Sequence, residues 1–189
     1  MSEEQLYDKI YEQKDQLQKL ISEYWHAFSG VDTWYFWFNI ASVIIPLLIL
    51  YFVIDRKRLF EICFFGYTIH VLWINIGSSL SSANYFVYPH SLTYIIPTGV
   101  NIAAVLLPIT FMLLYQYCMN YKKNFYVVAI IGALVFAYGF GSFSLAVDLL
   151  KVNKGMNLTY LFFIDVAVSF IAYWFTKLFL WFRNKKAKA

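Results

Sequence analysis

The sequence predicts an all-α integral membrane protein, a bundle of five transmembrane helices preceded by an amphipathic surface helix. Of the 189 residues, 61% are apolar and 14% are charged, whereas about a quarter of an average globular domain is charged. The chain also contains five apolar runs that reach the roughly 20 residues a helix needs to cross a hydrocarbon core. These runs are residues 34–54, 59–80, 97–119, 125–147 and 159–182.

The amino-terminal region, residues 1–33, has the pattern of an amphipathic helix. Ser2 and Gln5 have the spacing of a capping box, and Gly30 follows as a stop signal. Apolar side chains recur at helical spacing between them: Leu6, Ile10, Leu17, Ile21, Tyr24 and Phe28. Seven acids against three lysines suit a solvated face or a protein contact better than an anionic membrane. We expect this helix to pack on the protein's own outer surface, with a partner-binding coiled coil as the alternative.

The transmembrane domain, residues 34–182, begins with an aromatic cluster at 34–38, of the kind that anchors helix ends at the boundary of lipid and water. The first span is longer than the apolar part of a signal peptide, so we expect it to carry membrane entry itself. Pro46 lies in its middle and removes the backbone donor that the carbonyl of Ser42 would otherwise meet, which predicts a bend.

Lysine and arginine residues predict which ends of the spans face the cytoplasm. Two basic clusters follow the first and third spans: Arg56, Lys57, Arg58, Lys122 and Lys123. A basic tail, residues 183–189, follows the fifth span and should rest against anionic lipid. Because the spans alternate, these basic segments share one side. The positive-inside rule therefore predicts a cytoplasmic carboxyl terminus and an amino terminus outside.

The second span is the most polar, and we expect it to lie centrally. Polar side chains follow one of its faces at seven-residue spacing, and two glycines and a histidine follow another: Glu61, Thr68, Asn75 and Ser82, then Gly66, His70 and Gly77. A helix with two faces unsuited to lipid should face other helices. Glu61 lies within a turn of Lys57 and Arg58, so we expect an ion pair at the membrane boundary.

The connector that follows, residues 81–96, has no formal charge and is rich in aromatic side chains. We expect it to lie in the headgroup layer or to fold back as a lid over the helices. The third span is predicted to begin at Pro97. The fourth carries a small residue at every fourth position, Ala129, Ala133, Ala137 and Gly141, which predicts close packing against a neighbouring helix.

Polar residues gather in the outer half of the predicted bundle, and they are the candidate binding residues. Asp165 is the one carboxylate well inside a span, and an ionisable group at this depth is a functional candidate by default. The alternating spans bring other polar residues to its level or slightly deeper: Asn75, Ser78, Ser79, Asn101, Ser142, Ser144 and His70. We expect an outward-opening pocket beneath the connector that holds a small amphipathic or lipid-like ligand. Hydrogen bonds between helices, with Asp165 bonded to Asn75 or Asn101, are the alternative.

Motifs for catalysis are missing from the sequence. The patterns H-E-x-x-H and G-x-S-x-G and the phosphate loop do not occur, and no pair of ligands has metal-site spacing. We therefore name no catalytic, cofactor-binding or metal-ligating residue. The basic residues cluster at span ends, so we expect the lipid bilayer and no nucleic acid as a partner.

Two further functions stay open at this point. The bundle could be an assembly subunit that binds a second copy or another membrane protein through the amino-terminal helix and the small-residue stripe 129–141. It could also be a lipid-modifying enzyme in which His70 and Asp165 act as acid and base, which requires them within hydrogen-bond reach.

Several short motifs occur in order along residues 34–182. Asp-Arg-Lys-Arg-Leu at 55–59 with Glu61 and Gly66 is followed by Tyr-Pro at 88–89, by Pro97 and Pro108, and by Tyr-Gln-Tyr at 115–117. In these motifs the chain resembles a family of small multi-spanning membrane proteins from Bacillus and related Firmicutes. The resemblance implies a five-span bundle in a Gram-positive plasma membrane and no particular activity. It places acidic residues where this chain has Asn75, Asn101 and Ser142, so proton or cation chemistry that depends on those acids is not implied here.

Overall fold

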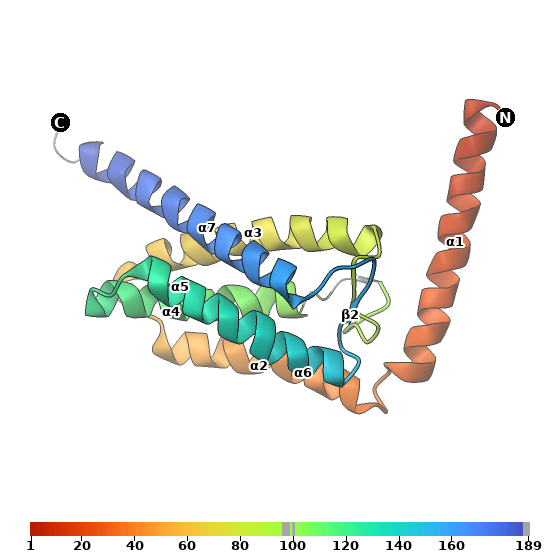
Figure 1. The fold of residues 1–189 in the computed structure, drawn as a ribbon, viewed down its shortest axis with the longest axis horizontal. Coiled ribbons are helices and arrows are strands. Elements are labelled where there is room, and N and C mark those ends of the chain that lie inside the picture. Colours follow the sequence, from red (N-terminus) through yellow and green to blue (C-terminus); the bar gives the residue numbers. More distant parts are fainter. Residues whose placement is uncertain (96–98, 100, 187–189) are drawn as a thin grey trace.

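The structure, a computed structural model, describes residues 1–95, 99 and 101–186 and is helical almost throughout (Figure 1). Its α-helices are α1 (Glu3–Phe28), α2 (Trp34–Val53), α3 (Leu59–Ser82), α4 (Leu107–Tyr121), α5 (Phe125–Leu134), α6 (Gly141–Ala146) and α7 (Leu158–Lys186). A 3-10 turn, η1 (Arg56–Arg58), leads into α3, and two π-helical segments, η2 (Asn101–Leu106) and η3 (Val135–Phe140), precede α4 and α6. Two short strands complete the fold, β1 (Phe86–Val87) and β2 (Lys151–Val152).

Five stretches of these helices are long and apolar enough to cross a membrane, which confirms the predicted fold class. They are Trp34–Val53, Arg56–Ser82, Asn101–Tyr121, Phe125–Ala146 and Leu158–Lys185. The predicted start of the third span, Pro97, lies outside the described residues. Continuous helix is the expected solution, because every backbone polar group in hydrocarbon must find its partner within the protein.

The third span lies at the centre of the bundle. More than half of its apolar window, 56%, is buried inside the protein, against 28% for the second span and 11% for the first. The second span was expected to be central, and that prediction is wrong. Two of the polar side chains on which it rested, Thr68 and Asn75, bond within α3 to the carbonyls of Phe64 and Val71.

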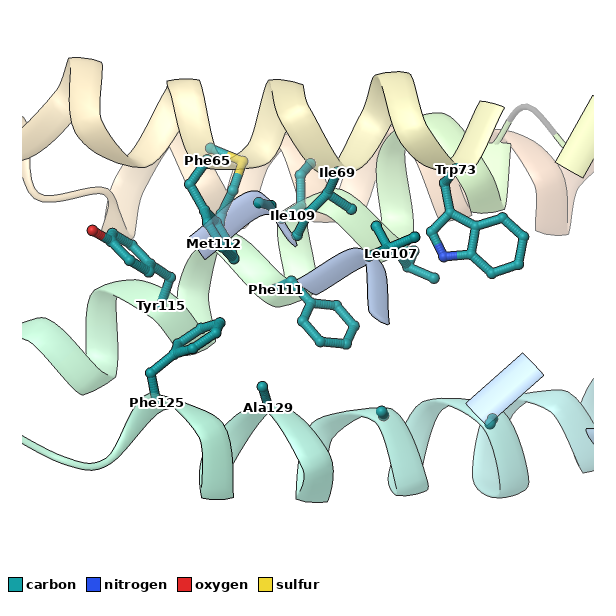
Figure 2. Packing of buried hydrophobic residues seen from close by; sticks show 14 of the residues in the cluster. Phe65, Ile69, Trp73, Leu107, Ile109, Phe111, Met112, Tyr115, Phe125 and Ala129 are labelled. Carbon is teal, nitrogen blue, oxygen red and sulfur yellow. The ribbon is translucent and has the colours of Figure 1, made fainter. Parts of the chain in front are cut away.

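Aromatic side chains fill the core between α3, α4, α5 and α7. Figure 2 shows Phe65 and Tyr115 facing one another across α3 and α4, with Phe125 on the opposite side. Phe65 stacks on Tyr115 at 4.5 Å between ring centroids, and Phe125 stacks on Tyr173 at 4.4 Å. Because lipid tails are as apolar as these rings, close packing rather than escape from water holds the helices together here.

The small-residue stripe lies on the inner face of α5 and α6. Ala129, Ala133 and Ala137 are fully enclosed, and Gly141 is buried beside them. A methyl group on Gly141 would come within 2.9 Å of the Leu158 side chain. The close helix packing predicted from the stripe is therefore present. Its residues are used within the protein, so the stripe offers no surface to a partner.

The connector folds back over one end of the helices. Strand β1 pairs antiparallel with β2, and the amide of Asn153 donates to the carbonyl of Tyr85 at 3.0 Å. The amides of Leu149 and Leu150 both donate to the carbonyl of Ser144, which ties the second loop to the end of α6. We call this the connector end, and the opposite end, with η1 and the turn between α4 and α5, the basic end (Figure 1).

Helix α1 stands away from the bundle instead of packing along it (Figure 1). The predicted capping box of Ser2 and Gln5 is present, and no residue of α1 is classed as buried. Contacts to the connector come from its last three turns, where Gln18 donates to the carbonyl of Tyr94 at 3.3 Å and the Trp25 indole to that of Ser91 at 3.0 Å. The expectation that it packs on the protein's own surface is thus met only by these turns. Periodicity shows which face of a helix is apolar, but the turn at Gly30 decides where that face points.

Candidate functional site

The carboxyl group of Asp165 lies inside the bundle. Its residue is 2% exposed, and Oδ1 accepts a hydrogen bond of 2.7 Å from the indole nitrogen of Trp73 on α3. The sequence suggested Asn75 or Asn101 as the partner, and Trp73 takes that place. A carboxyl group within hydrocarbon is costly unless it meets donors or water, which is why it turns inward.

A cavity of about 30 Å³ borders this carboxyl group. Both π-helical segments form part of its wall, through Ile102 and Ala103 of η2 and Phe136, Ala137 and Phe140 of η3. A π-helical turn holds one more residue than an α-helical turn, so it shifts the side chains that follow, and such turns are often found at functional sites. Here two of them face one enclosed space.

Ser144 supplies a second polar group to the same cavity. The residue is 1% exposed, and its Oγ finds no hydrogen-bond partner among the residues that the structure describes. Buried hydroxyl groups are normally paired with protein or with an ordered water molecule. The cavity is large enough for about two water molecules, since each needs roughly 10–15 Å³ of such volume. A water molecule that bonds Ser144 would lie in the same cavity as Asp165.

Tyr88 of the connector closes the cavity at the connector end. Its side chain lines the space together with Trp73, Ser144 and Asp165. Burial raises the pKa of the Tyr88 hydroxyl well above its ordinary value, and the negative charge of Asp165 adds to this rise. The phenol therefore stays protonated and can serve as a hydrogen-bond donor.

An outer groove of about 680 Å³ lies on the other side of Tyr88. Its apolar wall comes mainly from α1, with Leu17, Leu20, Ile21, Tyr24 and Trp25. Polar groups at the end of α3 and in the connector form the facing wall: Ser81, Ser82, Asn84 and Ser91. Tyr88 is the residue that lines both the groove and the inner cavity.

A separate polar network holds Asn101. Its Nδ2 donates to Oδ1 of Asn39 at 2.7 Å and to Oγ of Ser42 at 2.8 Å, both on α2. Asn39 in turn donates to the carbonyl of His90 at 2.8 Å. Because each member is buried and paired, this network fastens the connector and η2 to α2, and it does not line the Asp165 cavity.

The imidazole of His90 continues this network toward α1. Its Nδ1 forms a 2.8 Å hydrogen bond with Oγ of Ser29, and its ring stacks on Tyr35 at 3.5 Å between centroids. Burial lowers the pKa of His90, an effect that Lys151 reinforces and Asp148 opposes. The neutral ring thus joins the end of α1 to the connector.

The remaining predicted pocket residues lie apart from Asp165. His70 Nδ1 bonds to the carbonyl of Ala104 at 2.9 Å, and His70 does not line the cavity. Asn75 and Ser79 are exposed and bond within α3, to the carbonyls of Val71 and Asn75. Ser142 is exposed as well, and Ser144, two residues on, is the serine that faces the cavity. The structure therefore brings Asp165 together with Trp73, Tyr88 and Ser144.

Glu61 was expected to pair with Lys57 or Arg58, and it bonds elsewhere. The hydroxyl of Tyr115 donates to its Oε1, and no ion pair of Glu61 occurs among the described residues. Tyr115 reaches Glu61 from the facing helix α4, where its ring is fixed by stacking on Phe65. The five topology residues lie at the basic end, Arg56, Lys57 and Arg58 in η1 and Lys122 and Lys123 in the turn between α4 and α5.

Trp73 and Tyr88 are the site residues that sequence reasoning missed. An indole N–H within a span needs an acceptor, because none is available in hydrocarbon. Asp165 is the one carboxylate deep in a span, so the hydrogen bond between Trp73 and Asp165 could have been deduced from the sequence. Tyr88 gave no comparable signal, since it lies in a connector with several other aromatic residues.

The fold and the site together define the class: a five-span helical membrane protein with an enclosed carboxyl group beneath an outer groove. No group of three or more His, Cys, Asp or Glu that could hold a metal ion occurs in residues 1–95, 99 and 101–186. Comparisons with family models, with curated proteins and with solved structures find no match to this chain.

Proposed function

We propose that the protein is a binding protein of a Gram-positive plasma membrane that holds a small amphipathic or lipid-like molecule at its outer face, for sensing or for movement across the leaflet. In this proposal the amino terminus and the outer groove lie outside the cell, and the basic end faces the cytoplasm. The gathering of basic residues at one end supports this orientation.

The outer groove supports the proposal by its size and lining. Its volume of about 680 Å³ falls within the range of roughly 300–1,000 Å³ that is usual for small-molecule sites. One wall is apolar, with Leu20 and Trp25, and the other is polar, with Ser81 and Asn84. A molecule with an apolar body and a polar end fits such a surface.

Tyr88 is the observation that carries the proposal, because it lines both the groove and the Asp165 cavity. The inner cavity, at about 30 Å³, has room for water but not for the body of a ligand. A ligand in the groove would touch one side of Tyr88, and the other side faces the space shared by Ser144 and Asp165. Movement of Tyr88 would then change the surroundings of the buried carboxyl group.

The test uses the full chain in nanodiscs with a dansyl-labelled fatty amine as the probe. The chain has six tryptophans and Trp25 lines the groove, so the part of the energy transfer to dansyl that Trp25→Phe removes reports a probe bound there. Leu20→Glu places a charge in the apolar wall and should weaken binding roughly tenfold or more. Leu6→Glu lies on the same helix outside the groove and should bind like the wild type. Equal binding by both variants and the wild type would rule out the groove.

A second measurement asks whether the groove and the cavity are linked. Probe binding should raise the thermal midpoint of the wild type, and Asp165→Asn should alter that rise. Asn75→Leu, at an exposed position on α3, should leave it unchanged. If probe binding is normal but the rise is the same in all three proteins, the groove binds without any effect on Asp165.

The second candidate function is a subunit of a membrane assembly, and the free position of α1 favours it. Leu6, Ile10 and Leu17 are about half exposed along one face of this helix. Unpartnered apolar side chains in such a row are typical of a contact surface. Deletion of residues 2–22 keeps Trp25 and Ser29 in place, and sizing in detergent should then show a smaller complex. An unchanged size would argue against this function.

A further inference from the structure

A second groove, of about 530 Å³, lies at the basic end between η1 and the last turns of α7. Its lining is dominated by charge and contains five cations and one carboxylate: Arg56, Lys57, Arg58, Lys177, Arg183 and Glu61. Three of these cations follow the first span and two belong to the last. The groove is therefore made only when the start of α3 packs beside the end of α7.

The cations of this groove have no carboxylate partner in the described part of the chain. The ion pairs found there join Lys19 to Asp15 on α1 and Lys151 to Asp148 beside β2. None of these four residues lines the groove. Glu61 is engaged by the hydroxyl of Tyr115, and Asp55 accepts the backbone amide of Lys57 at 3.0 Å. A concentration of positive charge that the protein does not balance attracts an anion.

Lys177 gives the groove a fixed inner charge. Its Nζ donates to Sδ of Met119 at 3.4 Å and lies over the ring of Tyr173, 5.1 Å from the centroid. The sequence alone allows the Lys177 side chain to extend to the lipid headgroups. In the structure, the contacts to Met119 and Tyr173 hold its ammonium group against the wall of the groove. A partly buried ammonium without a carboxylate is well placed to meet a bound anion.

The surroundings of the groove point to the bilayer. Phe60 lines it and is 90% exposed, and Leu59 beside it is also exposed. Since these residues begin a membrane span, their apolar side chains face lipid at the level where headgroups lie. Arginine and lysine side chains bind phosphate oxygens, arginine with two parallel hydrogen bonds. We propose that the groove binds the phosphate group of an anionic phospholipid, with a soluble phosphate ester as the other source of the same chemistry.

The test compares lipids and soluble phosphates on the full chain. Thermal midpoints are measured in nanodiscs of phosphatidylcholine with and without phosphatidylglycerol, and in phosphatidylcholine with added glycerol phosphate. A rise with phosphatidylglycerol alone identifies the lipid as the source, and a rise with glycerol phosphate identifies a soluble ester. No rise with either probe would overturn the proposal.

Matched variants distinguish lipid binding in the groove from general attraction of anionic lipid to the positively charged end of the protein. Lys177→Gln with Arg183→Gln removes two groove cations and should weaken phosphatidylglycerol binding roughly tenfold or more. Lys122→Gln with Lys123→Gln removes the same charge from the same end outside the groove and should retain binding. Lys177→Arg keeps the charge and should bind within about twofold of wild type. An equal loss in the two double variants would mean that the groove is not a site.

Discussion

The imidazole of His70 donates to the backbone carbonyl of Ala104, at 2.9 Å, and so joins α3 to η2, directly before α4. In an α-helix that carbonyl would meet the amide at position 108, but residue 108 is proline and has no N–H to offer. His70 supplies a donor from the neighbouring helix instead. Since the carbonyl can only accept, the proton lies on Nδ1.

We expect His70→Leu to lower the free energy of unfolding by about 0.5–1.5 kcal/mol, the usual size of a hydrogen bond between membrane helices. Thermal unfolding in detergent measures the loss. Asn75→Leu is the control, because that side chain is exposed and bonds within its own helix. An equal loss in both variants would mean that the bond to Ala104 contributes nothing of its own.

Trp73→Phe should destabilise the protein more than Asp165→Asn does. Removal of the indole N–H leaves the buried carboxyl group without its donor, which costs about 1–3 kcal/mol or more. Asn at position 165 still accepts from Trp73 through its amide oxygen. A double-mutant cycle of Trp73→Phe with Asp165→Leu, which removes the acceptor, should show a coupling energy of at least about 0.5 kcal/mol by thermal unfolding. Additive losses would indicate that the bond is energetically neutral.

Stability should decline as the pH falls below 6.5, through His90. Burial lowers its pKa in the folded protein below the ordinary value of 6.5, so the unfolded chain binds the proton first. The decline occurs between 6.5 and the lower pKa of the folded state, and it ends below that lower pKa. Thermal midpoints at about pH 7.5 and 5.5 measure it. The groups around the ring are Ser29, Tyr24, Tyr35, Asp148 and Lys151.

Two variants isolate the contribution of His90 from that of other groups that titrate. His90→Gln should flatten the decline, whereas His26→Gln should leave it in place, because His26 lies exposed on α1. If both variants keep the wild-type dependence, another group is responsible.

Gln116→Leu should loosen the end of α2. The side chain of Gln116 donates to the carbonyl of Val53 at 2.9 Å and accepts from the amide of Asp55 at 2.8 Å. Loss of both bonds leaves two backbone groups unpaired and should cost about 1–3 kcal/mol. Hydrogen exchange at residues 53–55 should speed up first. Tyr117→Phe, at the exposed neighbouring position, should change neither exchange nor stability.

The spans were predictable because lipid imposes a length and a composition that few other structures share. Hydropathy marked all five, and the capping box at Ser2 and Gln5 marked the start of α1. The rotation of each helix about its axis was harder to deduce. Asn75 and Ser142 lie at suitable depths but on exposed faces, whereas Trp73 and Ser144, two residues away, face the interior.

For Ser142 and Ser144, which follow η3 in the fourth span, that difference has a cause in the backbone. Periodicity assumes 3.6 residues per turn, and the π-helical segments η2 and η3 break this count within two of the five spans. Side chains after such a segment point elsewhere than a regular helix would place them. The composition of Asn101–Leu106 and Val135–Phe140 is that of any apolar helix, so nothing in these residues predicts a π-helical turn.

The wide turn at Val135–Phe140 also ties the cavity to the hydrogen-bond pattern of the backbone. If the same residues formed a regular α-helix there, every later residue of the span would be turned by about 100°. Ser144 would then point away from Asp165, although no residue lining the site had been replaced. In this part of the molecule the pairing of backbone groups matters as much as the identity of the side chains.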